Sequence, residues 1–268
     1  MKNFGPAATR VATARTLLFV PGDRPDRFAK AAASGADLVI IDLEDAVAAE
    51  NKECARTAAA EWIAAGNDAV VRVNAPRTAW YPLDISSLAS HALAIMVPKA
   101  ESRDEWAGCD LPIIPLIETA RGVAVAAYLL DGPEVVRPAF GSIDLSVEIG
   151  IDPGDHTALL YTRSRLVLAA AATGCAPPID GVTPAVRDED ALRRDVEHAR
   201  RLGFSAKLCV HPAQIGPTRE LLRPTAEEIS WARRVVDEAR DGAALVDGEM
   251  VDAPVLARAQ GVLERNDS

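Results

Sequence analysis

Short runs of β-branched and aliphatic residues alternate with alanine-rich amphipathic segments along most of this chain, and that alternation limits its fold more than any other feature. It is typical of parallel strands joined by helices. We expect strands at Thr16 to Val20, Leu38 to Ile41, Ala69 to Val73, Ala94 to Val97, Ile113 to Leu116, Val136 to Phe140, Pro178 to Asp180 and Ala206 to Cys209. Eight is the number of strands in a (β/α)8 barrel, and 268 residues suffice to build one as a single domain.

The segments between the expected strands have ends that are characteristic of helices. A glycine after the last apolar turn can adopt a positive φ and end a helix, as at Gly35, Gly66, Gly174 and Gly203. Asp188 is suited to cap the start of the helix that follows it. The expected helices are Pro25 to Ser34, Asn51 to Ala65, Thr119 to Leu130, Thr157 to Thr173, Asp188 to Leu202 and Ala226 to Asp241.

The organisation of the domain follows from the same pattern. A doubly wound open sheet has a similar alternation, but it would need a glycine-rich phosphate loop, and neither GxGxxG nor GxxxxGK[ST] is present. We therefore predict an α/β protein with one (β/α)8 TIM barrel at residues 15–240. Residues 1–14 are expected to be a flexible lead, and residues 241–268 a tail that could sit apart and pack on a neighbouring subunit.

Charge, cysteine content and hydropathy exclude several classes of protein. A net charge of -10 argues against a nucleic-acid binder, which needs a basic surface. The four cysteines form no CxxC pair, which favours reduced thiols in a cytoplasmic protein. The longest apolar runs, Val123 to Leu130 and Leu166 to Ala172, are far shorter than the roughly 20 residues that span a bilayer. We expect neither nucleic-acid nor membrane partners.

Polar residues gather where the expected strands end, and in a (β/α)8 barrel these ends form the rim that carries catalysis. Glu118 and Asp144 lie at consecutive strand ends and are expected to face one another. Two carboxylates about 4 Å apart repel by about 4 kcal/mol at an effective dielectric of about 20, so they need a cation, a shared proton or an arginine. Mg²⁺ suits one or two carboxylates, with water and substrate at its remaining positions. The alternative is that each acid caps the helix that follows it.

Arg72 and an acidic run have both a functional and a structural interpretation. Arg72 lies inside an apolar strand, where its guanidinium needs an anion. It either holds a substrate carboxylate or an enolate oxygen, or pairs internally with Asp42 or Glu44. Asp42, Glu44 and Asp45 either orient metal-bound water or form a solvated loop with a helix cap.

Two further residues at the expected rim are open in the same way. Lys99 either binds a carboxylate or phosphate of the substrate, or forms an ion pair with Glu118. His211 follows the last strand, where it is either a base or part of a His-Pro turn. There is no GxSxG motif and no cysteine with an evident histidine partner, so covalent nucleophilic catalysis is not suggested.

Ordered blocks of the sequence resemble the citrate lyase beta-subunit family, which includes malyl-CoA and citramalyl-CoA lyases and related Mg²⁺ aldolases. The opening block is RTLLFVPGDRPDRFAKAAASGADLVIIDLEDAVAAENKECAR, and VRVN, VPKAES, LIETARGV, FGSIDL, AKLCVHPAQI and DGEMVDAP follow in the family's order. Together they run from Arg15 to about Pro254. Asp23, in the PGDR turn, departs from the small neutral residue that is more usual in the family.

The resemblance implies a trimeric or hexameric barrel with a defined set of site residues. Glu118 and Asp144 would bind Mg²⁺, and Arg72 would contact the keto acid. Basic residues near the PGDR turn, with Arg24 and Lys30 as candidates, would meet the phosphates of coenzyme A or a similar carrier.

The sequence thus leads to the hypothesis of a Mg²⁺-dependent carbon–carbon lyase. The metal would chelate the carboxylate and carbonyl oxygens of a short 2-keto acid such as pyruvate, oxaloacetate or glyoxylate, and act as a Lewis acid. A carboxylate, either Asp252 or a member of the Asp42 to Asp45 group, would move the proton. Asp252 resembles an aspartate that reaches into a neighbouring subunit's site in longer lyases of this group, although a helix cap is the alternative. The products would be the keto acid and an acyl-CoA.

Two other functions remain open at this point. One is a citryl-carrier-protein lyase subunit that needs partner subunits. The other is a non-catalytic protein that binds a keto acid or an acyl-CoA in the same pocket. The choice of acyl chain depends on the shape of the pocket, which the sequence alone does not define.

Overall fold

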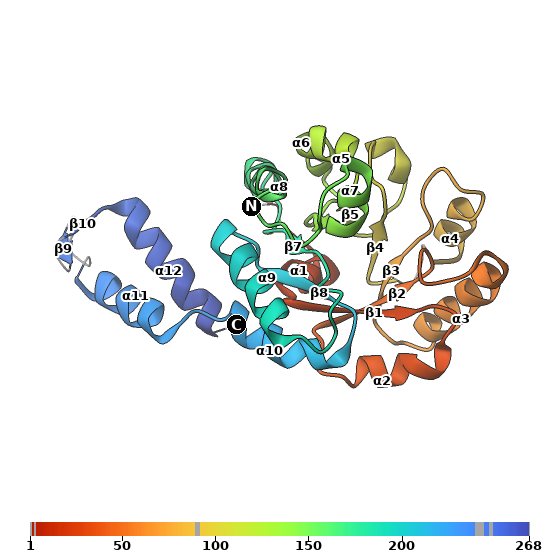
Figure 1. The fold of residues 1–268 in the computed structure, drawn as a ribbon, viewed down its shortest axis with the longest axis horizontal. Coiled ribbons are helices and arrows are strands. Elements are labelled where there is room, and N and C mark those ends of the chain that lie inside the picture. Colours follow the sequence, from red (N-terminus) through yellow and green to blue (C-terminus); the bar gives the residue numbers. More distant parts are fainter. Residues whose placement is uncertain (1, 3, 89–91, 239–243, 247–248, 268) are drawn as a thin grey trace. The chain divides into compact units, whose positions relative to one another are not determined.

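A closed barrel of parallel strands makes up most of the protein. The computed structural model describes residues 2, 4–88, 92–238, 244–246 and 249–267. Each barrel strand pairs with the next in chain order, and β8 closes the ring on β1 (Figure 1). Every expected strand overlaps an observed one, so the (β/α)8 barrel predicted from the sequence is confirmed. The barrel strands are β1 (Thr16–Pro21), β2 (Leu38–Asp42), β3 (Val70–Arg72), β4 (Ala94–Val97), β5 (Ile113–Ile117), β6 (Ala139–Phe140), β7 (Ile179–Asp180) and β8 (Ala206–Cys209).

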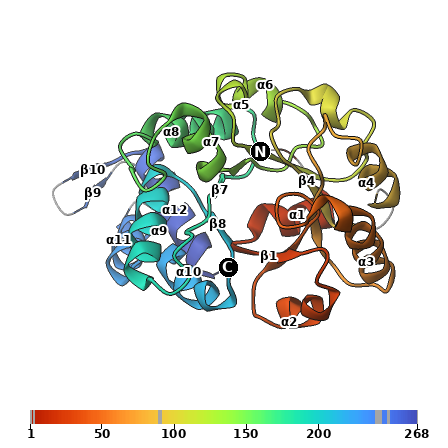
Figure 2. The same cartoon turned by 45° about the vertical axis from the view of Figure 1, so that its right-hand side comes forward.

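Helices surround the barrel strands on the outside (Figures 1 and 2). The predicted helix ends are confirmed, because Gly35, Gly66, Gly174 and Gly203 all have positive φ and Asp188 caps α9. Helices α4 and α7 were not among those expected from the sequence, and one long expected helix is broken into α5 and α6. The helices of the barrel unit are α1 (Pro6–Thr13), α2 (Phe28–Ala32), α3 (Lys52–Ala64), α4 (Tyr81–Leu88), α5 (Ala120–Ala124), α6 (Ala126–Leu130), α7 (Ser142–Ile149), α8 (Leu160–Ala172) and α9 (Glu189–Leu202), with short 3-10 helices η1 (Pro25–Arg27), η2 (Ala49–Asn51), η3 (Arg103–Trp106) and η4 (Pro212–Gln214).

Alternation along the strands separates two apolar layers. In β2, Leu38 and Ile40 belong to the cluster that fills the barrel interior, while Val39 and Ile41 pack with the surrounding helices. The same alternation holds in β5, where Ile114 and Leu116 face the barrel interior and Ile113 and Ile117 face the helices. Side chains of successive strand residues point to opposite faces, so the next inward-facing position in each strand lies at the mouth of the barrel.

Helix α1 closes the N-terminal end of the barrel, where the sequence analysis placed a flexible lead. Its buried residues Ala8 and Val11 join the interior apolar cluster. The fully buried Arg137 guanidinium donates hydrogen bonds to the carbonyl oxygens of Val11, Ala12 and Ala14, at 2.8 to 3.2 Å. These are carbonyls of the last turn of α1, so a buried cation satisfies acceptors that the helix cannot. The segment was missed because eight residues are too few for a clear helical period.

The contacts within the chain divide it into two units, Met1–Arg219 and Glu220–Ser268. Helix α10 (Ile215–Leu222) spans this division. The second unit contains α11 (Ala226–Glu238), an antiparallel pair of strands, β9 (Ala244–Val246) and β10 (Glu249–Val251), and α12 (Ala253–Asp267). It has a small core of its own. The last residues of the expected helix to Asp241 lie outside the described residues, and the predicted boundaries at 240 and 241 stay a prediction.

No helix among the described residues is both long enough and apolar enough to cross a membrane.

Candidate active site

Charged side chains replace apolar ones where the inward-facing positions reach the mouth of the barrel. In β2, the inward-facing Leu38 and Ile40 are followed by Asp42. The same alternation makes Arg72, at the end of β3, and Glu118, directly after β5, inward-facing residues. The register of the parallel pair places Asp42 opposite Arg72. The fold therefore brings together three residues that the sequence analysis assigned to the site.

Arg72 and Asp42 form a buried, two-pronged ion pair. Arg72 Nε and Nη2 lie 2.7 and 2.6 Å from the two oxygens of Asp42. The amides of Glu44 and Ala46 also donate to Asp42, at 2.9 and 3.0 Å. Burial alone would raise the pKa of Asp42, but Arg72 and these amides hold it below its usual value. The internal ion pair, one of two interpretations of Arg72, is thus present, and it leaves Nη1 to face Glu44 at 3.3 Å and Asp45 at 3.8 Å.

Lys52 fixes the loop that carries the acidic run, and the sequence analysis did not single it out. Its buried ammonium donates to the carbonyl oxygens of Leu43 and Glu44, both at 2.7 Å, and lies over the ring of Trp80. A signal was available, because a lysine at the first position of a helix opposes the helix dipole and so needs a specific partner.

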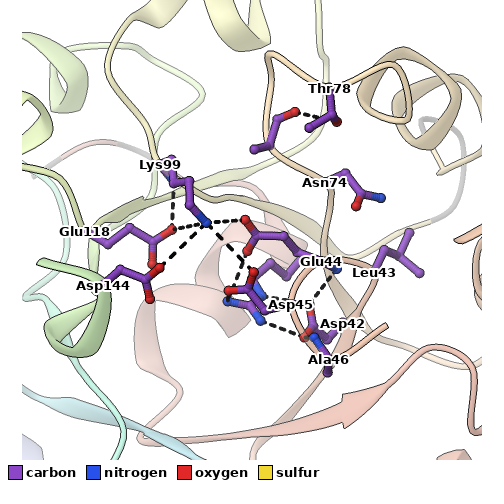
Figure 3. A network of polar contacts seen from close by, with 12 residues as sticks. Asp42, Leu43, Glu44, Asp45, Ala46, Asn74, Thr78, Lys99, Glu118 and Asp144 are labelled. Atoms are coloured by element: carbon purple, nitrogen blue, oxygen red, sulfur yellow. Dashed lines mark hydrogen bonds and ion pairs between the residues drawn. The ribbon is translucent and has the colours of Figure 1, made fainter. Parts of the chain in front are cut away.

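Lys99 reaches into the centre of the mouth, among carboxylates from several elements (Figure 3). Its Nζ lies 2.6 Å from Glu44 Oε1, 3.9 Å from Glu118 Oε1 and 3.8 Å from Asp144 Oδ1. Although burial opposes it, the hydrogen bond to Glu44 and the nearby carboxylates raise the pKa of Lys99 to about 12. Among the described residues, Lys99 alone has a positive φ without being a glycine, at 50°. This conformation lets its amide donate to Glu118 Oε1 at 2.9 Å.

Glu118 and Asp144 point toward the same space beside the Lys99 ammonium (Figure 3). Glu118 is buried, and burial followed by the charges of Glu44 and Asp144 raises its pKa to about 8. Asp144 does not end a strand as the sequence analysis expected, because β6 stops at Phe140 and Asp144 lies in the first turn of α7. The two carboxylates still converge, since α7 begins only two residues after the strand.

The charges at the mouth suit a divalent cation. No group of three or more His, Cys, Asp or Glu side chains in the described part of the chain has the arrangement of a metal site. A site made here would therefore use two carboxylates with water and substrate, the arrangement that Mg²⁺ accepts. When all are ionised, five carboxylates face three cations, an excess of two negative charges; they are Asp42, Glu44, Asp45, Glu118 and Asp144 against Lys52, Arg72 and Lys99.

Several candidates from the sequence lie outside this network. Arg24 pairs with its near neighbour Asp26 at 3.0 Å, and Lys30 is exposed on α2. His211 accepts a hydrogen bond from the Ala213 amide at 3.1 Å, which fits a chain turn better than a base. Asp252, in the second unit, caps α12 by accepting from the Val255 amide at 3.1 Å. Roles for Arg24, Lys30 and Asp252 in binding or catalysis stay predictions.

A family model described as HpcH/HpaI aldolase/citrate lyase matches residues 15–109 and 107–212 of the chain. A citrate lyase subunit beta-like protein of Mycobacterium tuberculosis is 40% identical over 260 residues, which cover 92% of this chain and 94% of that protein. A (3S)-malyl-CoA thioesterase of Cereibacter sphaeroides is 33% identical over 267 residues, with 94% of each chain covered.

Solved structures agree with these relatives. The protein CitE of Mycobacterium tuberculosis, in complex with magnesium, acetoacetate and coenzyme A, has a TM-score of 0.85 and 38% identity, and the match covers 96% of this chain and all of that one, 100%. A citrate lyase beta subunit of the same organism, complexed with oxaloacetate and magnesium, has a TM-score of 0.72 and 36% identity over 80% of this chain and 100% of that chain. Magnesium in these relatives agrees with the cofactor predicted from the sequence.

The Arg72–Asp42 ion pair should make the free energy of unfolding depend on pH in the acidic range. Because the folded state lowers the pKa of Asp42, the pair contributes fully above the unfolded value, and its contribution is lost as pH falls through the folded value. We expect Asp42→Asn to lower the free energy of unfolding by about 3 to 5 kcal/mol near neutral pH. The difference from the parent should shrink towards about pH 3. Urea unfolding across this range measures it.

Asp68→Asn is the matched control for that series, because Asp68 pairs with Arg10 on the surface at 2.6 Å. Its effect should stay below about 1 kcal/mol throughout. A cost of Asp42→Asn that does not change with pH would contradict the assignment.

Proposed function

The chain belongs to the HpcH/HpaI aldolase/citrate lyase family, and on this premise we propose that it is a magnesium-dependent carbon–carbon lyase. It would cleave a hydroxyacyl-CoA of the citramalyl, malyl or citryl type into a 2-keto acid and an acyl-CoA. The observation that carries the proposal is the convergence of Glu118 and Asp144 beside Lys99 and Arg72 at the mouth of the barrel. The complexes of the solved relatives with magnesium, keto acids and coenzyme A support it.

Glu118 and Asp144 are the residues that would hold magnesium. One carboxylate is buried and fixed by a backbone amide, while the Asp144 side chain is 40% exposed, so one side of the site stays open for water and substrate. Bound magnesium would supply a Lewis acid for the carbonyl oxygen of the keto acid.

Arg72 and Lys99 would hold the negative charge of the keto acid. Asp42 occupies Nε and Nη2 of Arg72, so Nη1 is the end of the fork that would meet a substrate oxygen. Asp42 is therefore proposed as a positioning residue, although the sequence analysis grouped it with the catalytic carboxylates. The basic residues Arg24 and Lys30 remain our candidates for the phosphates of coenzyme A.

Cleavage needs a carboxylate that takes the proton of the substrate hydroxyl. The carbon–carbon bond then breaks, its electron pair remains on the α-carbon of the thioester as an enolate, and that carbon takes up a proton to give the acyl-CoA. Glu44 is a candidate base because it lies at the mouth beside Arg72 and Lys99, and burial raises its pKa above the usual value against the opposing effects of those two cations. Asp45, more than half exposed at the mouth, and Asp252 of the second unit are the other candidates.

Product analysis tests the reaction class. Malyl-, citramalyl- and citryl-CoA are incubated with the protein and Mg²⁺, and keto acid and free thiol are measured separately. A lyase releases keto acid and keeps the thioester, whereas a thioesterase releases free thiol and no keto acid. Thiol release alone would replace our proposal with the activity named for the Cereibacter sphaeroides relatives. Turnover only with added partner subunits would indicate a citryl-carrier subunit, and binding without any turnover a sensor.

The trimeric or hexameric assembly and the cytoplasmic location remain proposals.

Removing either proposed metal ligand should abolish most of the affinity for magnesium. We expect Glu118→Ala and Asp144→Ala each to weaken Mg²⁺ binding by at least about tenfold, or about 1.4 kcal/mol. Isothermal titration calorimetry measures the affinity. Asp68→Ala removes an exposed carboxylate and is the control. Parent-like affinity in both site variants would show that the metal site is elsewhere.

Arg72 is expected to contribute to the binding of the keto acid and not to the binding of the metal. Arg72→Lys keeps a positive charge beside Asp42 but loses the planar fork that can bind two partners at once. We expect oxaloacetate to bind at least about tenfold more weakly in the presence of Mg²⁺, while the Mg²⁺ affinity changes little. The same calorimetric titrations separate the two effects. An unchanged oxaloacetate affinity would remove Arg72 from substrate binding.

A further inference from the structure

Gly141 lies so close to the side chain of Glu118 that any side chain at 141 would force a shift in the structure. A Cβ atom built on Gly141 would come nearer than 3.0 Å to both Cβ and Oε2 of Glu118, a distance that real Cβ atoms essentially never show. The backbone of Gly141 does not itself call for glycine, because its φ of -95° and ψ of 79° do not lie in the left-handed region. The requirement for glycine at this position is therefore one of space.

The position of Gly141 in the chain links it to both proposed metal ligands. It joins the end of β6 to the start of α7, and Asp144 follows three residues later in the first turn of that helix. Its amide donates to the carbonyl oxygen of Ile117 at 3.0 Å, directly before Glu118. A shift at Gly141 would thus change the relation between the segments that carry the two carboxylates.

The other side of the Glu118 carboxylate is held as well. Its Oε1 accepts a hydrogen bond from the Lys99 amide at 2.9 Å, and its Oε2 lies towards Gly141. The carboxylate therefore occupies a slot between a backbone amide and a residue without a side chain.

We infer that Gly141 is a positioning residue for the metal site, because its missing side chain makes the slot that sets where the Glu118 carboxylate stands relative to Asp144. This inference rests on the proposed role of those two carboxylates in holding magnesium. Rotation of Glu118 would relieve the contact with Oε2 but not the contact with Cβ, which is fixed to the backbone. An alanine at 141 must therefore move the backbone of β5 or of the β6–α7 junction. Mg²⁺ tolerates little departure from near-ideal octahedral geometry, so such a move should cost affinity.

Gly22→Ala provides a matched control. A Cβ on Gly22 would meet Leu43 Cδ2 at 2.7 Å and the Asp42 carbonyl oxygen at 2.9 Å, so it also crowds the rim. Its crowding falls on the end of β2, on the residue after it and on α3, however, and not on the segments that carry Glu118 and Asp144.

Calorimetric titration with Mg²⁺ of the parent chain, Gly141→Ala and Gly22→Ala tests the inference. We expect the affinity of Gly141→Ala to fall about 10- to 100-fold, as is usual when a group that orients a metal ligand is lost, and that of Gly22→Ala to stay within about twofold. Equal affinities of the parent and Gly141→Ala, or equal losses in both variants, would overturn it. A parent chain that binds no Mg²⁺ would instead sink the proposed function.

A second measurement does not depend on the metal. Gly141→Ala should lower the midpoint of thermal unfolding in metal-free buffer when Glu118 is present, and should lower it much less in a Glu118→Gly background, because Glu118→Gly removes the side-chain atoms that the new Cβ would meet. Comparing the two backgrounds separates a specific collision with Glu118 from general damage to the fold and from any stability gained by removing the buried carboxylate itself, and it applies even where Gly141→Ala alone folds too poorly to titrate. An equal loss in both backgrounds would contradict the slot.

Discussion

The mouth of the barrel depends on one constraint, which is that more carboxylates are packed there than the local cations can neutralise. Glu118 is strongly affected by the excess of negative charge, because burial among other acids raises its pKa to about 8. The surrounding structure holds the carboxylate in place nonetheless, through the amide of Lys99 and the space beside Gly141. A cation that binds here would relieve the repulsion between the carboxylates, and it would bind well because its ligands are already in position and need not reorganise.

Much of the fold could be predicted from the sequence, because the strands are short apolar runs with clear helix ends between them. The parity of those strands also explains why Asp42, Arg72 and Glu118 meet. The features that could not be predicted from the sequence are those that depend on which residues lie close together in space. Only Gly141 separates β6 from α7, so Asp144 was assigned to a strand end. Helix α4, YPLDISSL, contains a proline, two serines and an isoleucine, which are weaker helix formers than alanine or leucine.

The cations of the site show a similar limit. Arg72 could be recognised, because a charge inside an apolar strand needs a partner. The partners of Lys52 and of the Lys99 amide could not be identified without coordinates, since they are carbonyl oxygens of the loop after β2 and the carboxylate of Glu118, which the fold brings there. Arg137 is a similar case at the opposite end of the barrel, where its partners include carbonyl oxygens at the end of α1 and the carbonyl oxygen of Pro177.

The charged side chains at the mouth differ in how firmly they are held. On one side, Arg72, Asp42 and Lys52 are bonded to one another or to the backbone before any substrate is present. On the other side, Lys99 is 38% exposed in its side chain and lies at 3.8 to 3.9 Å from both proposed metal ligands, too far for hydrogen bonds. Repulsion would move its ammonium away from a divalent cation, and Glu44, at 2.6 Å, is the acceptor that would retain it. Arg72 is thus suited to orient the keto acid, while Lys99 is the cation that a divalent ion would displace from between the fixed carboxylates.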